Sequence, residues 1–470
     1  MEKFFKVSEH GSTVKTEIIA GLTTFMAMAY ILMVNSGMFS DLETLTYGAI
    51  YIATGISAVI GTVLIGLLSN LPLAQASGMG LNAFFVYTVC FGLGFTYANA
   101  LLFVLADGLL FILLTVTGLR KLIFDAIPAP VKAAIPAGIG LFIAFLGFQD
   151  AKIVIASEST GVTLASFNLL GGASWADIMP LLVTIAAVIS MAVLSKKKVK
   201  GAILWSILGG AAVYYLLGLT IPDFYKGLFD GVSMNPLAAF GEFGELAFGK
   251  VFTEGFDFST YLAGEGHSVG GLVITFVTTA LAFCMVDMFD TMGTLYGACR
   301  SGNLLYKNEK GEDEVPNMNQ AMLADAIATC TGAICGTSTV TTFVESSSGV
   351  AVGGRTGLSS MVTALMFLIA LFLSPVAALI PACAYAAALV YVGVLMIGCV
   401  KDIDWSDPAS AIPSFLTITM MPFTYNISYG IAFGLISYVA IRLFTGEAKK
   451  VNAGTWIVSI LFLAMFFLTH

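Results

Sequence analysis

Long stretches without a charged residue divide the chain. Residues 44–106, 356–400 and 408–441 contain no Asp, Glu, Lys or Arg. A helix that crosses a bilayer needs about 20 apolar residues, so each stretch has room for one to three crossings. The pattern therefore predicts an all-α, polytopic membrane protein.

The apolar runs predict about fourteen spans in two sets of seven. The first set comprises residues 15–38, 46–69, 80–92, 97–118, 132–148, 178–195 and 201–218. The second comprises residues 270–298, 320–338, 346–354, 358–380, 383–399, 409–425 and 427–444. A last apolar run, 454–469, is short for a span, and whether it crosses the membrane stays open.

Composition excludes several classes of protein. Hydrophobic residues make up 58% of the chain and charged residues 11%, whereas a soluble surface needs roughly twice that share of charge. The net charge of −8 argues against a nucleic-acid partner. The cysteines and histidines lack metal-ligand spacing, and the polar loops are too short for an enzymatic core, so neither a metal, a cofactor nor catalysis is predicted.

The distribution of Lys and Arg predicts the orientation. Alternate loops carry the basic residues, among them Arg120, Lys121 and the lysines of residues 196–200, whereas the loop 221–268 is mostly neutral or acidic. Cytoplasmic loops carry an excess of Lys and Arg. We therefore expect a protein of the cell membrane with a cytoplasmic N-terminus and 221–268 outside.

The second half echoes the first. Residues 53–62 align without gaps on residues 328–337 with five identities in ten, and residues 22–27 align similarly on 277–282. Chance among small residues is the alternative. Both pairs nevertheless fall on corresponding spans, and an odd number of spans per copy inverts the second copy, as in many secondary transporters.

Two short segments are interrupted by Gly or Ser. They are residues 75–85, QASGMGLNAFF, and residues 341–355, TTFVESSSGVAVGGR, at the third and tenth spans. Short broken segments at matching positions of two repeats indicate a midplane site with helix N-termini aimed at the ligand. The alternative is that 69–80 and 339–357 are ordinary loops.

Five acids lie within or against apolar segments: Asp107, Asp287, Asp290, Asp325 and Glu345. Each charged carboxylate costs about 2.5–3.5 kcal/mol or more at the bilayer centre, so none should face lipid. Asp290 and Glu345 are interpreted as functional, and Asp287 as either functional or orienting Asp290, which shares its helix face. Asp325 near a cytoplasmic helix end and Asp107 in a bond across helices are interpreted as structural.

Four motifs resemble the purine permeases of the azaguanine-permease type, the adenine/guanine/hypoxanthine branch of the nucleobase–cation symporters, which are related to xanthine/uracil permeases. They are AGLTTFMAMAY at 20–30, GMGLNAFF at 78–85, MFDTMGTL at 288–295, and VESSSG at 344–349 with GGRTG at 353–357. The resemblance covers nearly the whole chain.

That resemblance implies two inverted seven-span repeats with a core domain and a gate domain. The core would comprise 1–119 and 269–381, the gate 120–220 and 382–450, with the loop 221–268 outside and 451–470 as a C-terminal apolar segment. The family imports purine bases with protons, by an elevator-like movement of the core against the gate. Guanine or hypoxanthine is the first expectation and adenine the second, with the proton gradient as driving force, and a homodimer would fit the family.

The resemblance also implies site residues. Asp290 and Glu345 match the acids that hold the purine ring, and Gly80 and Asn82 match substrate-contacting positions. Two further substrate-binding candidates are Ser346 and Phe84. Either Phe84 or Phe85 could stack on the faces of the base, and the alternative is that both simply pack within the protein. The candidates for proton coupling are Asp287, Asp290 and Glu345. Thr294 stands where the xanthine/uracil branch has an Asp, which favours the purine branch and leaves the proton carrier open.

Other functions remain as alternatives. The nearest is a carrier of another small planar or anionic solute on the same fold, although Arg355 is the one cation near the expected site. A channel would show a ring of charges or a repeated filter, and an intramembrane aspartyl protease would show a Gly-x-Gly-Asp context. Saturable uptake, ion currents and peptide cleavage distinguish these classes.

Overall fold

The computed structural model of the chain describes residues 2–118, 126–226, 235–264, 268–307 and 313–468. Within these residues, nine helices are long and apolar enough to cross a membrane. They are Val14–Ser40, Tyr47–Ser69, Tyr97–Thr117, Ala129–Asp150, Trp175–Lys196, Val269–Ser301, Gly357–Ala377, Ala382–Asp402 and Ile427–Phe444. Arg120 and Lys121, which contribute to the predicted orientation, lie outside the described residues.

The first half is built mainly from helices, with three short strands among them. Its elements are α1 (Glu2–Phe5), α2 (Val14–Met28), α3 (Tyr30–Ser40), α4 (Tyr47–Ser69), β1 (Gln75–Ser77), α5 (Met79–Ala83), the π-helix η1 (Phe84–Gly92), α6 (Tyr97–Thr117), α8 (Ala129–Asp150), α9 (Trp175–Lys196) and α10 (Ala202–Gly218). A hairpin of β2 (Val154–Ser157) and β3 (Gly161–Leu164) lies between α8 and α9.

The second half repeats this order after a connecting segment. The segment carries α11 (Pro236–Glu242), α12 (Lys250–Thr253) and α13 (Ser259–Leu262). Then come α14 (Val269–Ser301), the hairpin β4 (Tyr306–Lys307) and β5 (Asp313–Glu314), α15 (Met318–Cys335), β6 (Val340–Thr342), α16 (Ser346–Val352), α17 (Gly357–Ala370), α18 (Ser374–Ala377), α19 (Ala382–Met396), η5 (Ile397–Asp402), α20 (Pro408–Thr424), α21 (Ile427–Phe444) and α22 (Ala453–Leu468).

Helices therefore occupy each of the predicted ranges, and several begin at a residue that caps them. Thr46, Ser174, Ser268 and Asn426 each accept a hydrogen bond from the backbone N–H three residues later. Such a side chain satisfies one of the backbone donors that the first turn leaves without a partner. The predicted first span agrees with the structure, where α2 and α3 follow each other through the helical residue Ala29 and form one span, Val14–Ser40.

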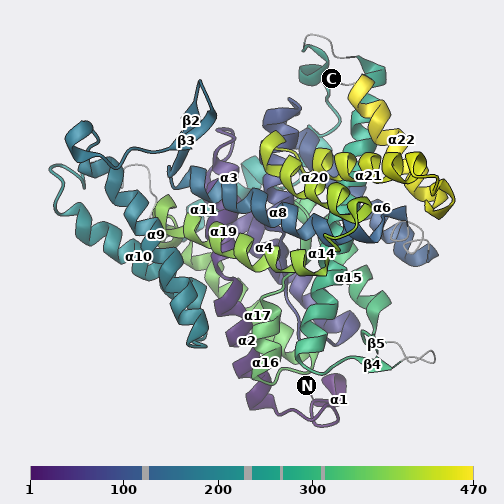
Figure 1. Ribbon diagram of the computed structural model, residues 1–470. Helices are drawn as coiled ribbons and strands as arrows, with labels where there is room; N and C mark the ends of the chain where they lie inside the picture. Colours follow the sequence, from purple (N-terminus) through teal and green to yellow (C-terminus); the bar gives the residue numbers. More distant parts are fainter. Residues whose placement is uncertain (1, 119–125, 227–234, 265–267, 308–312, 469–470) are drawn as a thin grey trace.

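The helices pack in two groups (Figure 1). In one, α4 packs on α15 and α17, α6 packs on α15 and α14, and α2 packs on α16 and α17. In the other, α8 packs on α19 and α20, α9 packs on α10 and α19, and α20 packs on α21. The aligned residues 53–62 and 328–337 lie on α4 and α15, so the two copies of the sequence repeat are direct neighbours in space.

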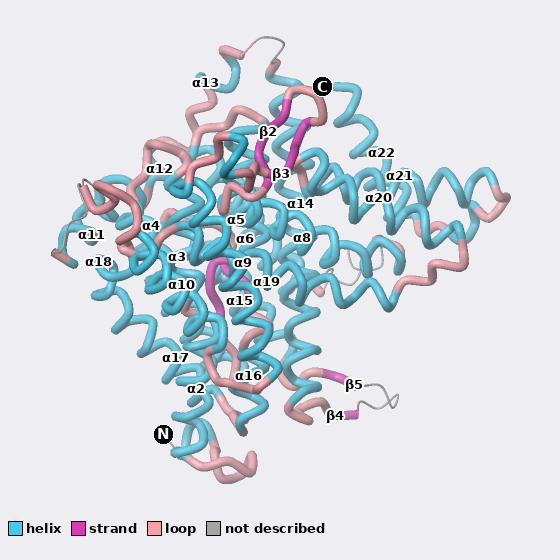
Figure 2. Tube along the Cα trace, turned by 60° about the vertical axis from the view of Figure 1, so that its left-hand side comes forward, coloured by secondary structure: helices cyan, strands magenta, loops and turns pink. Residues whose placement is uncertain are grey.

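The two interrupted segments meet in an antiparallel strand pair. Gln75 lies opposite Thr342 and Ser77 opposite Val340, and every residue of both strands is buried. In Figure 2 the unlabelled magenta segment in the middle of the molecule lies among helices, whereas the labelled strands lie at the edge. Non-helical backbone at membrane depth must be satisfied by protein, which this pairing achieves. Each strand leads into a short helix, α5 or α16, so neither segment is an ordinary loop.

The ends of the molecule carry the polar connections. The N-terminus and the β4–β5 hairpin lie at one end, and the β2–β3 hairpin and α13 lie at the other, in both views (Figures 1 and 2). This separation agrees with loops on two sides of a membrane. Which side is cytoplasmic stays a prediction from the Lys and Arg distribution.

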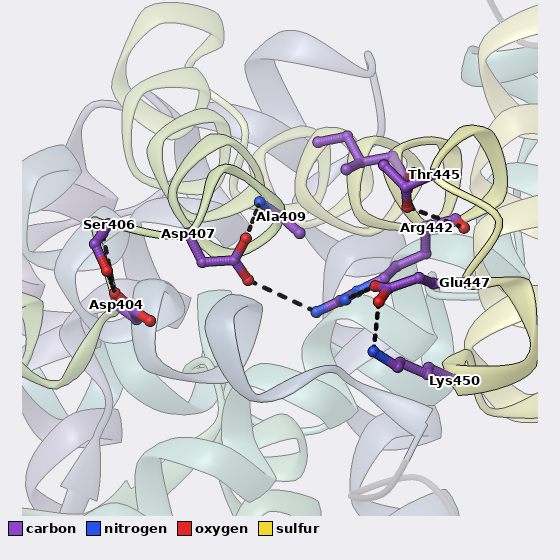
Figure 3. Close-up of polar contacts among 9 residues, drawn as sticks. Asp404, Ser406, Asp407, Ala409, Arg442, Thr445, Glu447 and Lys450 are labelled. Atoms are coloured by element: carbon purple, nitrogen blue, oxygen red, sulfur yellow. Dashed lines mark hydrogen bonds and ion pairs between the residues drawn. The ribbon is translucent and has the colours of Figure 1, made fainter.

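A polar cluster joins α20, α21 and the turn that follows α21. Asp407 accepts a hydrogen bond from the backbone N–H of Ala409 at the start of α20, and its Oδ2 lies 3.8 Å from Arg442 Nη2 (Figure 3). Glu447 pairs with both Lys450 and Arg442. The hydrogen bonds from Lys450 and Arg442 lower the pKa of Glu447. Because these side chains are still partly exposed to solvent, the pairs are screened and contribute little to stability.

Candidate functional site

A cavity of about 520 Å³ lies where the two groups of helices face each other. Its volume is within the usual range of small-molecule sites, roughly 300–1,000 Å³. It reaches the beginnings of both short helices, at Met79 of α5 and at Glu345 and Ser347 of α16. The crossing of the two interrupted segments therefore forms part of its wall.

The two walls of the cavity differ in polarity. One is lined by polar side chains from α3, α14 and the segment 341–347, namely Tyr30, Asp290, Thr294, Thr341, Thr342, Glu345 and Ser347. The facing wall is contributed by α8, α19 and η5 and is almost entirely apolar, with Pro136, Ile139, Ile143, Val392, Leu395, Met396 and Cys399. A ligand would make its hydrogen bonds on one side only.

Glu345 is held by a tyrosine from the other repeat. The Tyr30 hydroxyl donates a hydrogen bond to Glu345 Oε1 over 2.6 Å, and both side chains are buried. Tyr30 is the first residue of α3, and it also lines the cavity. A hydrogen bond to a charged acceptor is stronger than a neutral one and fixes the carboxylate in one position.

Asp290 lines the cavity and is partly exposed within it. The Thr341 hydroxyl of β6 donates to its Oδ2 over 3.4 Å, and the negative charge of Glu345 acts on it. Among the described residues that line the cavity, none is Lys or Arg. The wall therefore offers two carboxylates without a cationic partner, and such groups accept hydrogen bonds from ligand N–H donors.

Gly80 lines the cavity at a close approach of α5 to α8. A Cβ at this position would lie 2.5 Å from Cγ2 of Ile139, closer than two side chains can pack. The residue is helical, so its role is the absence of a side chain. Glycine at this position permits the backbone approach.

Asn82 and Phe84 are not among the described residues that line the cavity. Asn82 is buried and accepts a hydrogen bond from the Ser77 hydroxyl over 2.6 Å, which ties α5 to β1. Phe84 is buried against Phe283, with ring centroids 4.7 Å apart. In this structure it packs within the protein, so the expected stacking on a base has no support from its position.

Ser346 and Asp287 also lie away from the cavity surface. The Ser346 hydroxyl accepts from the backbone N–H of Ala74 over 3.0 Å and so holds the chain just before β1. Asp287 is completely buried and accepts from the Thr329 hydroxyl over 3.1 Å. Asp287 and Asp290 share a helix, but only Asp290 is at the cavity.

Two further acids were expected to be structural. Asp107 accepts from the Thr339 hydroxyl over 3.2 Å, which is the expected bond between separate segments. Asp325 lies in the interior of α15, where it accepts from Gln75 of β1 over 2.8 Å, rather than near a helix end. The expectation of a terminal position was therefore wrong, because the side chain braces the strand pair.

The cavity has three aromatic residues that the sequence did not single out as site residues. They are Tyr30, Phe289 and Phe343. Each lies in or next to a motif: Tyr30 ends the first, Phe289 precedes Asp290, and Phe343 precedes the fourth. A position within or next to one of the motifs was the available signal.

Comparisons with known proteins agree with this arrangement. Residues 15–433 match the sequence profile of a permease family of the xanthine/uracil type. The chain is 36% identical to the adenine permease AdeP of Escherichia coli, over 98% of this chain and 95% of that one. It is 37% identical to the guanine/hypoxanthine permease PbuG of Bacillus subtilis, over 98% and 99% of the two chains.

A solved structure shares the fold. The transmembrane domain of the cyanobacterial bicarbonate transporter BicA matches with a TM-score of 0.58 at 17% identity, over 88% of this chain and 97% of that one. At this identity the likeness shows the fold alone. The helical architecture of this chain is thus shared with that domain.

Proposed function

From the premise that the chain belongs to the permease family, we propose that it imports purine nucleobases together with protons, guanine and hypoxanthine before adenine. Membership confirms the resemblance in the sequence motifs and makes the chain a multi-pass membrane transporter rather than an enzyme. Its relatives include permeases for adenine and for guanine/hypoxanthine at similar identity. These relatives support a nucleobase substrate. They do not distinguish between the purines, so the preferred purine is inferred from the chemistry of the site.

The observation that carries the proposal is the pair of acids on one wall. A neutral purine is flat and carries N–H donors on its edge, which Asp290 and Glu345 can accept. Phe289 and Phe343 line the same cavity and offer aromatic surface for the ring faces. Since the lining described here contains neither Lys nor Arg, an anionic solute, the alternative on this fold, is disfavoured.

The choice of oxopurines follows from the acceptors. Guanine and hypoxanthine present an N–H at ring position 1, whereas neutral adenine presents an unprotonated nitrogen there. A carboxylate accepts from the first and is repelled by the lone pair of the second. Adenine can still donate from its exocyclic amine, so it is the second candidate.

The contrast between the walls supports an elevator-like movement of core against gate. The polar wall comes from the predicted core segments, 1–119 and 269–381, and the apolar wall from the gate segments, 120–220 and 382–450. An apolar gate surface holds no part of the ligand, so the core can carry the base past it. The proposal includes two inverted seven-span repeats and a cytoplasmic N-terminus, supported by the repeat and by the basic loops.

The test is uptake of labelled hypoxanthine into proteoliposomes, with and without an inward proton gradient. Guanine, adenine, xanthine, uracil and bicarbonate serve in turn as unlabelled competitors, and protein-free liposomes as control. Gradient-driven uptake that guanine blocks and uracil does not would support the proposal. If adenine alone competes, the substrate assignment moves to adenine, and competition by bicarbonate alone would replace the nucleobase with an anion.

A further inference from the structure

Three aspartates form a buried cluster behind the cavity. Asp107 of α6, Asp287 of α14 and Asp325 of α15 each have 0% exposed surface, and none lines the cavity. The ion pairs between described residues lie elsewhere in the chain. We call Asp107, Asp287 and Asp325 the aspartate cluster.

The three carboxyl groups are near enough to influence one another. The negative charges of Asp325 and Asp107 both act on Asp287, and that of Asp325 acts on Asp107. Three buried charges without a cation would be very costly, so carboxyl groups in this situation bind protons. The cluster is therefore a place where protons are held inside the protein.

Acceptor atoms without a donor give an independent indication of the missing hydrogens. Among the described residues, Asp107 Oδ1, Asp287 Oδ1 and Gln75 Oε1 are buried and have no hydrogen-bond partner. The Gln75 side chain lies beside the cluster, because its Nε2 donates to Asp325 Oδ1 over 2.8 Å. Gln75 is neutral, so its Oε1 without a partner is an amide oxygen next to the cluster. Buried acceptors are nearly always satisfied. A protonated carboxyl supplies an O–H donor that an ionised one lacks.

The ligand that fits is a proton and not a metal ion. In the described part of the chain, no group of three His, Cys, Asp or Glu side chains is placed to hold a metal. The other titratable groups that interact with the cluster are Cys284 of α14 and Cys330 of α15, both beside Asp107, and Asp290. None of these carries a positive charge.

The cluster is bonded to the strand pair that forms the cavity wall. Asp325 accepts from Gln75 of β1 and from Thr342 of β6, the latter over 3.0 Å. The Thr329 hydroxyl lies within hydrogen-bond distance of both Asp287 Oδ2, at 3.1 Å, and the carbonyl oxygen of Val340 in β6, at 3.2 Å, and its single proton is available to either. Thr339 donates to Asp107 from the residue before that strand.

The same strand reaches the substrate acid. Thr341, between Val340 and Thr342 in β6, donates to Asp290 at the cavity, and the charge of Asp290 acts on Asp287 and Asp325. From this arrangement we propose that Asp107, Asp287 and Asp325 form the proton site that couples the proton gradient to binding of the base. This proposal rests on the proposed function.

The sign of the coupling is that of a symporter. A proton on the aspartate cluster removes a negative charge near Asp290 and so favours the ionised form of Asp290. The ionised carboxylate accepts the N–H of the base, so proton and base bind better together than separately. Coupling between two sites is reciprocal, so bound base also favours the proton.

The variants Asp287→Asn and Asp325→Asn test the coupling in proteoliposomes. Each replaces an acid by an amide of the same size and removes a proton-binding group. We expect exchange of labelled for unlabelled base, which needs no gradient, to stay within threefold of the unmodified protein, and gradient-driven accumulation to fall at least tenfold. Glu17→Gln is the control, because Glu17 is equally buried but bonds the start of α17; it should keep both activities.

Accumulation retained in both Asn variants would overturn the proposal, as would accumulation driven by a sodium gradient in the unmodified protein. Loss of exchange in the correctly folded variants would place these acids in the substrate site and overturn the proposal as well.

Infrared absorption separates this proposal from the proposed function, because the measurement needs no transport. At neutral pH the unmodified protein should show the C=O band of protonated carboxyl groups, weakened in the variants and retained in Glu17→Gln. An unchanged band would refute the proton site even if base transport is confirmed, and a weakened band would support it even if no base is transported.

Discussion

The hydroxyl of Tyr30 lies 2.6 Å from Oε1 of Glu345 and donates a hydrogen bond to it. The two residues are 315 positions apart in the sequence, one in each half of the chain. The bond joins the start of α3 to the start of α16 at the cavity wall. The bond positions Glu345, which is expected to contact the base. The bond itself is not a contact with the base.

Tyr30→Phe should therefore weaken base binding without abolishing transport. A hydrogen bond to a charged group contributes about 1.5–3 kcal/mol, so we expect KM for the base to rise roughly tenfold or more. Concentration-dependent uptake measures this. Tyr51→Phe is the matched control, because Tyr51 donates to the carbonyl of Ala370 away from the cavity. An unchanged KM in Tyr30→Phe would show that Glu345 does not need this positioning.

Asp290→Asn and Glu345→Gln test the base contacts directly. An amide presents an N–H donor where the carboxylate presented an acceptor, so an N–H of the base loses its partner. We expect each variant to abolish uptake while the protein remains folded in the membrane, as judged by size-exclusion chromatography in detergent. Asp41→Asn, which removes an acid outside the cavity lining, should transport normally. Normal uptake by either test variant would remove that acid from the site.

The helical ranges could be predicted from the sequence because each apolar run has its own polar boundary. The range 46–69 became α4 at Tyr47–Ser69, for example. The position of Tyr30 at the cavity could not be predicted in this way, because it depends on the contact of α3 with Glu345, 315 residues away in the sequence.

Within the site, Asp290 and Glu345 could be singled out because buried acids are costly and rarely lack a reason. Phe84 could not be placed correctly, because a π-helix begins at this residue and changes the face that each side chain presents. The aspartate cluster could not be foreseen either. Its members come from three helices, and no pattern along one chain gives the distance between helices.

The aromatic rings of the cavity can be tested against the ring that packs elsewhere. Phe289→Leu should raise KM for the base about three- to tenfold, because an aromatic contact worth roughly 0.5–1.5 kcal/mol is lost. Phe84→Leu should leave KM unchanged and lower thermal stability, because Phe84 packs on Phe283 in the protein interior. Uptake kinetics and thermal unfolding of both variants provide the comparison. A raised KM in Phe84→Leu alone would restore Phe84 as the stacking residue.

Gly80 tests whether the close approach of α5 and α8 matters for transport. A methyl group at Gly80 would meet Ile139 Cγ2 at 2.5 Å, so Gly80→Ala must displace either α8 or the cavity wall. We expect uptake to fall at least tenfold, since a displacement of about 1 Å at a site can cost a hundredfold in rate. Gly209→Ala is the control, because, apart from its chain neighbours and the backbone of its own helix, no described atom lies within 4 Å of the added methyl group.

A second substitution identifies the cause of that loss. Ile139→Ala removes the side chain that the new methyl group would meet, so the double variant Gly80→Ala/Ile139→Ala should recover a large part of the uptake lost in Gly80→Ala. Such recovery is expected only when two substitutions act at one contact, because distant substitutions add independently. If Ile139→Ala adds its own loss to that of Gly80→Ala, the contact between α5 and α8 is not the reason for glycine, and a direct contact between Gly80 and the base would explain it instead.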